Sequence, residues 1–230
     1  MVRSEDLPRG LIDGKGEEGS LERTPSISGS TGVYRAESSW VARSYFSSMD
    51  VEDIKRIRDR YQVLEDVVLY IPDLDKRACS SKLDNVAFYE ADFNASLRFP
   101  MQPFMRELLG RLNLSPGQLA PNAWRTVISC MVMWRVCSRG ADAIMVDEFL
   151  YCYKLSQITV SSGFWTFNGQ QKGMKLITGL LTSNREWKDG FVFVCGDNWE
   201  DPHWEERDEN FVHIRQSWGV PPSSGVFHGF

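Results

Sequence analysis

The sequence lacks any apolar run of the roughly 20 residues that a helix needs to cross a bilayer. Residues 1–20 are polar and glycine-rich, without the apolar stretch of a secretory signal peptide. No aromatic residue occurs before Tyr34, so this part of the chain cannot bury enough apolar surface to offset the entropy lost on ordering. These absences predict a soluble protein without a membrane contact and with a disordered N-terminal tail.

Cysteine and histidine are scarce. The five cysteines are odd in number and form no Cys-x-x-Cys pair, and Cys130 and Cys137 fit buried thiols on one helix. The three histidines, His203, His213 and His228, form no pair at helical spacing. We therefore expect an intracellular, reducing compartment, nuclear or cytoplasmic, and no metal or cofactor.

Charge is unevenly placed along the chain, whose net charge is −5. Between Asp197 and Asn210, seven acidic residues against Arg207 give −6, so the rest of the chain sums to about +1. The core has no strongly basic footprint, and this balance neither supports nor opposes a nucleic-acid partner. The acidic segment, with two tryptophans and a proline among its acids, indicates a solvated loop with apolar anchors; the alternative is a carboxylate metal site.

The densest apolar pattern runs from Leu97 to Arg139 and predicts two consecutive helices. The first should begin near Pro103, because the fixed φ and missing N–H of proline suit the first helical position, and should end near Asn113. One apolar stripe follows this helix, at Phe104, Leu108, Leu109 and Leu112.

The second helix is preceded by the turn Leu114 to Leu119. We expect Ser115 to cap a helix start with Gln118 reaching back, and Pro121 to bend or restart the helix. Apolar residues on two faces predict a central helix that is buried almost all round: Trp124, Val127, Ile128, Met131 and Trp134 on one face, and Val132, Met133, Val136 and Cys137 on the other.

Five strings follow one another in this order: LRFPMQPFMRELL from Leu97, LSPGQLAPNAWR from Leu114, FLYCYKL from Phe149, GFWTFN from Gly163 and NREWKDGFVFV from Asn184. Over roughly residues 50–200 the chain resembles the N-terminal domain of plant gypsy-type transposon proteins, a family also labelled transposase or plant transposon protein. The resemblance implies a domain of transposon-derived proteins rather than a reaction. The residues that carry it, which we expect to be structural, are Leu97, Arg98, Pro100, Phe104, Gln118, Leu119, Pro121, Asn122, Trp124, Arg125, Trp187 and Lys188.

Members of that family continue into a long charged, helix-rich region, whereas this chain ends at Phe230, so we expect a truncated copy. The chain has no Tyr-x-Asp-Asp turn of a reverse transcriptase, no Asp-Thr/Ser-Gly of a retroviral-type protease and no Cys-Cys-His-Cys zinc knuckle. An integrase-like site of three carboxylates stays open, since spacing alone does not identify it among 31 acidic residues. We expect no catalytic residue and no enzymatic activity.

Outside the central helices, Asp50 predicts a helix start, with Met49 and Ile54 packed across it. The cations of this helix alternate with acids, which favours a solvated face over a phosphate-binding strip. Asp147 is expected to cap a short helix that carries Phe149, Leu150, Tyr153 and Leu155. Strands are expected at residues 67–71, 86–89, 163–167, 174–180 and 191–195.

Together these patterns predict an α+β fold in which central buried helices pack on a small antiparallel sheet, a meander in its simplest form. Residues 1–48 are expected to be a disordered tail, residues 49–218 a single domain and residues 219–230 a flexible tail. The composition favours an interaction or assembly module with a protein partner or with itself. The alternative is a nucleic-acid-binding domain of a transposase or integrase-type protein.

Overall fold

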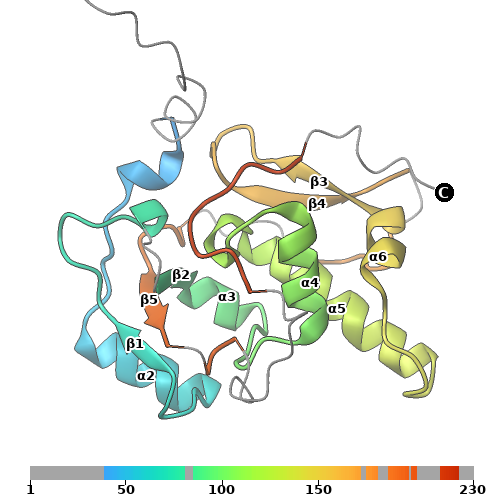
Figure 1. The fold of residues 1–230 in the computed structure, drawn as a ribbon, viewed down its shortest axis with the longest axis horizontal. Coiled ribbons are helices and arrows are strands. Elements are labelled where there is room, and N and C mark those ends of the chain that lie inside the picture. Colours follow the sequence, from blue (N-terminus) through green and yellow to red (C-terminus); the bar gives the residue numbers. More distant parts are fainter. Residues whose placement is uncertain are drawn as a thin grey trace, which may run out of the picture.

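The computed structural model describes residues 39–80, 85–171, 175–180, 186–196, 198–200 and 213–222 (Figure 1). It contains helices and two small antiparallel sheets, which confirms the α+β class. The elements are η1 (Val41–Ser44), α2 (Val51–Tyr61), β1 (Val68–Tyr70), η2 (Ala78–Ser80), β2 (Asn85–Tyr89), α3 (Glu90–Asn94), α4 (Pro103–Leu112), η3 (Pro116–Gln118), α5 (Pro121–Cys137), α6 (Val146–Cys152), β3 (Tyr153–Gln157), β4 (Trp165–Gly169) and β5 (Phe191–Cys195), where η marks a 3-10 helix.

The expected N-terminal tail lies outside the described residues up to position 38. Its last part, residues 39–48, is folded, so the boundary at residue 48 is wrong. Trp40 is buried against Trp218, with ring centroids 5.2 Å apart, and the Ser47 hydroxyl donates a 2.6 Å hydrogen bond to the carbonyl of Phe191. The buried ring of Trp40 supplies apolar burial that offsets the entropy lost when this segment is ordered.

The starts of α2, α4 and α5 follow their local sequence signals. The Asp50 carboxylate accepts from the backbone N–H of Asp53, and the Asp53 carboxylate accepts from the N–H of Asp50, both at 2.9 Å. Pro103 and Pro121 occupy the first positions of α4 and α5. These signals work because they satisfy or remove backbone donors that have no partner within the helix.

The strands form two separate sheets, so the expected meander is wrong. One sheet has the order β1-β5-β2 with both pairings antiparallel, and the other is the β3–β4 hairpin. Val194 lies opposite Leu69 on one side and opposite Val86 on the other. The last strand in the sequence is therefore the central strand of its sheet. In Figure 1 this sheet lies at the left and the β3–β4 hairpin at the upper right.

Both faces of the β1-β5-β2 sheet are covered. Val192 and Val194 of β5 belong to the first core cluster, together with Trp124 and Val127 of α5. Phe191 and Phe193 belong to the second core cluster, which also contains Trp40, Phe164 and Trp218. The alternation of strand side chains places the phenylalanines and valines of β5 in different cores, as the sequence predicts.

Two expected elements differ in the structure. Residues 175–180 form no strand, and the N–H of Ile177 donates to the Tyr153 hydroxyl at 3.0 Å. The helix expected to carry Tyr153 and Leu155 ends at Cys152, because the next residues pair with β4 as strand β3. Its N-cap is Met145, whose N–H donates to Glu148 at 2.8 Å, and not Asp147.

No helix in the described ranges is both long enough and apolar enough to cross a membrane.

Candidate functional site

Most residues that carry the family resemblance lie inside the fold. Leu97, Leu119, Trp124 and Gln118 are fully buried, and Pro121 is buried at the start of α5. Pro100 follows a cis peptide bond. The Phe104 ring meets the edge of Phe149 at 5.9 Å between centroids. The guanidinium of Arg98 donates to the carbonyls of Phe93 and Leu97 at 2.8 and 2.6 Å, and it lies over the Tyr61 ring.

Trp187 and Lys188 precede β5. Trp187 is buried in the second core cluster, and its carbonyl accepts from the N–H of Gly190 at 3.2 Å. The ammonium of Lys188 lies 5.4 Å from the centre of the Tyr45 ring, and partial burial lowers the pKa of Lys188. The Trp187 ring packs against the rings of Tyr89 and Phe164, at 4.6 and 5.0 Å between centroids, so both residues have packing roles.

The Gln118 side chain joins the turn before α5 to residues near the end of the chain. Its amide N–H donates to the carbonyl of Gly219 at 2.8 Å, and its oxygen accepts from the N–H groups of Gly219 and Ser115 at 2.7 and 3.1 Å. Residues 213–222, which we call the strap, are also held by Asn113, whose amide donates to the carbonyl of Val220. Gly219 is required there, since a Cβ would come within 2.0 Å of the Asn113 carbonyl oxygen.

Asp92 is a fully buried carboxyl at the start of α3. One of its oxygens accepts from the N–H of Tyr89 at 3.0 Å, and the other has no partner among the described residues. Burial raises the pKa of Asp92 well above its usual range, while the Tyr89 N–H and the charge of Arg125 act in the opposite direction. Arg125 itself donates to Asn122 at 2.6 Å. A lone buried acid with a backbone partner is a structural cap and carries no further chemistry here.

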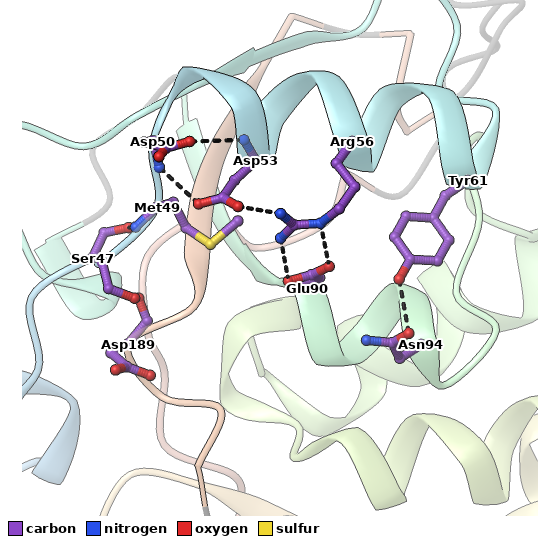
Figure 2. Close-up of polar contacts among 10 residues, drawn as sticks. Ser47, Met49, Asp50, Asp53, Arg56, Tyr61, Glu90, Asn94 and Asp189 are labelled. Atoms are coloured by element: carbon purple, nitrogen blue, oxygen red, sulfur yellow. Dashed lines mark hydrogen bonds and ion pairs between the residues drawn. The ribbon is translucent and has the colours of Figure 1, made fainter.

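Arg56 of α2 is paired with acidic side chains of its own helix and of α3 (Figure 2). Arg56 pairs with the Asp53 carboxylate and with both oxygens of Glu90, at 3.3 and 3.0 Å for the latter. The N–H of Asp50 and the guanidinium of Arg56 keep the pKa of Asp53 below its usual value. Arg58 donates to two backbone carbonyls, and Lys55 pairs with Glu52 at 2.8 Å. This helix therefore presents a surface of paired charges rather than a row of free cations.

Helix α5 is the element in which expectation and structure differ most. Its first half is a core helix, with Trp124, Val127 and Cys130 fully buried. The apolar pattern predicts that the second half is buried all round as well. This prediction is wrong, because Val132 and Val136 are 58% and 70% exposed. In Figure 1 this end of α5 lies at the lower right edge of the molecule.

Apolar and basic side chains that reach solvent together form what we call the outer face of α5: the half-buried Arg125 and the exposed Val132, Arg135, Val136 and Arg139. Arg125, Val132 and Val136 follow one another at steps of seven and four, which places them on one side of the helix. Arg135 and Arg139 are exposed and have no ion pair within the described residues. No acidic residue occurs between Leu114 and Gly140. The outer face therefore has two arginines on α5, Arg125 and Arg135, and Arg139 two residues beyond the end of the helix, without a negative charge in this stretch of the chain.

The acids and histidines considered for chemistry are mostly not described. Asp197, Asp201, Glu205, Glu206, His203 and His228 lie outside the described residues. Glu200 is described and buried, and its carboxylate accepts from the N–H of Ile214 at 2.6 Å, with His213 at 3.5 Å. No group of His, Cys, Asp and Glu placed to hold a metal occurs in the described ranges. Glu200 therefore joins the strap to the body of the protein.

Comparisons of the chain with models of protein families, with curated proteins and with solved structures find no match. The outer face of α5 is the candidate site on geometry alone. The sequence did not identify this face as a candidate site, because apolar residues at helical spacing predict burial and the sequence does not show which element would cover them. The absence of acids from Leu114 to Gly140 was the signal that could have marked this helix.

Proposed function

We propose that this chain is a non-enzymatic protein-interaction or assembly module of a transposon-derived protein, and that it binds its partner through the outer face of α5. The observation that carries the proposal is the exposure of Val132 and Val136 between arginines, on a helix whose opposite side forms the core. Apolar centres with arginine at the margin are typical of protein contact surfaces.

The rigidity of α5 supports this use of its outer face. Trp124 and Val127 fix the helix in the first core cluster, so the exposed side chains are presented on a fixed scaffold. A partner that covers two valines gains their burial, about 1.5–3 kcal/mol each for full burial, and loses little entropy in the helix itself. Such a surface favours protein contact.

The transposon assignment depends on the resemblance over roughly residues 50–200. Its first two strings become α4, η3 and the start of α5. These residues build the core that supports the outer face. The proposal therefore gives the family motif a structural role, and its contact residues Val132 and Val136 lie between the second and the third string.

The alternative is a nucleic-acid-binding domain. The three arginines of the outer face favour it, since cations aligned on a helix can follow a phosphate backbone. Two valines at the centre of the face oppose it, because a phosphate placed against apolar side chains loses water without gaining a hydrogen bond, which is costly.

A photo-crosslinking residue, benzoylphenylalanine, tests the proposal when it replaces Val132 in the full chain expressed in cells. Val160 is the matched control, because it is 85% exposed and lies in the β3–β4 connection. Discrete protein crosslinks from position 132 and none from position 160 are expected. Equal crosslinking from both positions contradicts the proposal.

Anisotropy titrations of DNA and RNA with the full chain, at several salt concentrations, test the alternative. We expect only weak association at physiological salt. Micromolar or tighter binding with a steep salt dependence, lost in Arg135→Glu, assigns the face to nucleic acid instead.

A further inference from the structure

We propose that the outer edge of β3 pairs with β3 of a second copy of this chain, antiparallel about a twofold axis, so that two β3–β4 hairpins join into one four-stranded sheet. This surface is separate from the outer face of α5, and the inference does not depend on the proposed function. It follows from the directions of the backbone groups of β3 and from the register in which this strand meets its own copy.

Hydrogen bonds at both ends of the hairpin show which backbone groups of β3 face away from β4. The N–H of Gln170 donates to the carbonyl of Cys152 at 2.8 Å, and the N–H of Ile158 donates to the carbonyl of Phe164 at 3.0 Å. Both bonds continue the register of β3 with β4. Hydrogen-bonded positions recur at every second residue of an antiparallel strand. The even-numbered residues of β3 therefore bond to β4, and the odd-numbered residues direct their backbone groups away from it.

Most of these outward groups have no partner among the described residues. The N–H of Tyr153 donates to the carbonyl of Phe149. The carbonyl of Tyr153 and both backbone groups of Leu155 and Gln157 have no hydrogen bond to the described parts of the chain. Ile177 comes close to this strand, but its N–H donates to the Tyr153 hydroxyl and not to the backbone. Five free backbone groups therefore line the outer edge of β3.

β3 is the outer strand of its hairpin. On the other side of β4, the N–H of Ala120 donates to the carbonyl of Trp165 at 2.9 Å, and Leu119 forms a bridge with the same residue. Edge strands that stay unpaired commonly carry prolines, bulges or several charges. β3 contains no proline, and Lys154 is its one charged residue. Little in its sequence opposes the addition of a further strand.

The pairing satisfies most of the free groups when the twofold axis passes through Leu155. The two copies of Leu155 then exchange two hydrogen bonds, and the N–H of each Gln157 donates to the carbonyl of Tyr153 in the other copy. Four of the five free groups of each copy gain a partner in this way. The paired stretch ends at Gln157, short of the connection that contains Val160.

The same register places compatible side chains opposite one another. Lys154 faces Ser156 of the second copy, so no two lysines lie directly opposite, and Leu155 faces Leu155. A second copy also fills its own open edge in the same contact, whereas an extended segment of another protein fills one edge only. These features favour a second copy as the occupant.

Gln157→Pro in the full chain tests the backbone contact. The change removes the outward N–H, and proline is tolerated at an edge position whose N–H does not bond within the sheet. Gln157→Ala is the matched control, because it removes the exposed side chain and keeps the N–H. Sedimentation velocity from micromolar to millimolar protein should show a parent dimer. The proline should raise its dissociation constant about tenfold or more, and the alanine should leave it unchanged.

Two substitutions of Ser156 test the register. Ser156→Lys places lysines opposite each other at two points of the contact and should weaken the dimer several-fold, whereas Ser156→Glu faces Lys154 of the second copy and should strengthen it. Opposite effects of the two charges cannot come from a general loss of folding. Effects of the same sign overturn the proposal.

A parent that stays monomeric overturns the proposal and leaves the edge to an extended segment of another protein. A dimer that responds equally to Gln157→Pro and Gln157→Ala overturns it as well. If the proline variant does not fold, hydrogen exchange of the parent decides. The amides of Leu155 and Gln157 should exchange more slowly as protein concentration rises, while those of Lys154 and Ser156, which bond to β4, should not change. Exchange at Leu155 and Gln157 that is independent of concentration overturns the proposal.

Discussion

Gln118 and Asp92 are buried polar side chains, and they differ in how far their polar atoms are hydrogen-bonded. Gln118 satisfies its own amide and three backbone groups of Ser115 and Gly219. Asp92 satisfies the N–H of Tyr89 with one oxygen and leaves the other without a partner in the described residues. Since an unpaired buried polar group costs about 1–3 kcal/mol, Gln118 contributes to stability and Asp92 reduces it at neutral pH.

Replacing Asp92 by asparagine should stabilise the protein at pH 7, because the amide keeps the acceptor for Tyr89 without a charge to bury. Burial raises the folded-state pKa of Asp92 above its unfolded value of about 3.9. The contribution of Asp92 to the free energy of unfolding is therefore most favourable below about pH 4. As the pH rises from the unfolded-state pKa to the folded-state pKa, the parent protein loses about 1.4 kcal/mol of stability per pH unit. Urea unfolding of the parent and of Asp92→Asn between pH 4 and 8 measures this.

The free energy gained by Asp92→Asn should shrink as the pH falls toward 4. A gain that is equal at pH 4 and pH 8 would show that folding leaves the pKa of Asp92 unchanged. A loss that grows with pH would show that the ionised carboxylate is favourably placed in the folded protein.

Replacing Gln118 by leucine should release the strap. The change leaves the Ser115 N–H and both backbone groups of Gly219 without their partner, at about 3 kcal/mol or more in total. Hydrogen exchange of the strap amides reports it directly. Arg215→Ala is the control, since it removes exposed hydrogen bonds to Asn113 and Ser217 and should cost less than about 1 kcal/mol.

At the scale of the element, α5 combines a core helix and a surface helix in 17 residues. Trp124 in its first half has no exposed surface, whereas Val136 in its second half is 70% exposed. The first half holds the helix in place and the second half presents side chains to solvent.

Truncating Trp124 to alanine should therefore cost about 3–5 kcal/mol, as expected for a buried large side chain. Val132→Ala in the same helix should change the free energy of unfolding by less than about 0.5 kcal/mol, as for exposed positions. Chemical denaturation of the two variants measures both changes in the free energy of unfolding and so distinguishes the buried half of α5 from the exposed half. Equal effects would mean that Val132 is covered in solution.

The starts of α2, α4 and α5 and the two faces of β5 could be predicted from sequence because their causes are local. Asp50 and Asp53 satisfy each other's backbone donors three residues apart, and the alternation from Phe191 to Val194 sets which side chain faces which core.

The pairing of strands and the burial of helix faces could not be predicted, because they depend on residues far apart in the chain. Tyr153 continues an apolar pattern that fits a helix, but β4 offers it a strand partner in Gly169. Val132 and Val136 have the same local pattern as buried residues, and only the assembled fold shows them exposed. The contacts of the strap with Gln118 span about a hundred residues of sequence and have no local signature.

For the whole molecule, the β1-β5-β2 sheet joins two cores into one unit. Phe193 faces the second core cluster and Val194 the first, and both lie on the central strand. Loss of packing in either core cluster therefore disturbs β5, which also contributes side chains to the other cluster.

Phe193→Ala and Val194→Ala should therefore lower the same unfolding transition, by about 3–5 kcal/mol for the phenylalanine and about 2 kcal/mol for the valine. Circular dichroism and tryptophan fluorescence should give coincident midpoints for both variants. Two separated transitions in either variant would show that the cores unfold independently.

The position of β5 between β1 and β2 also has a consequence during translation. β1 and β2 do not pair with each other, and each finds its partner only in a strand made roughly a hundred residues later. At about 5–20 residues per second, the ribosome needs about 5–20 s to supply it. For that time a nascent chain exposes two unpaired strands, Val68–Tyr70 and Asn85–Tyr89, which need shielding from other chains until the sheet closes.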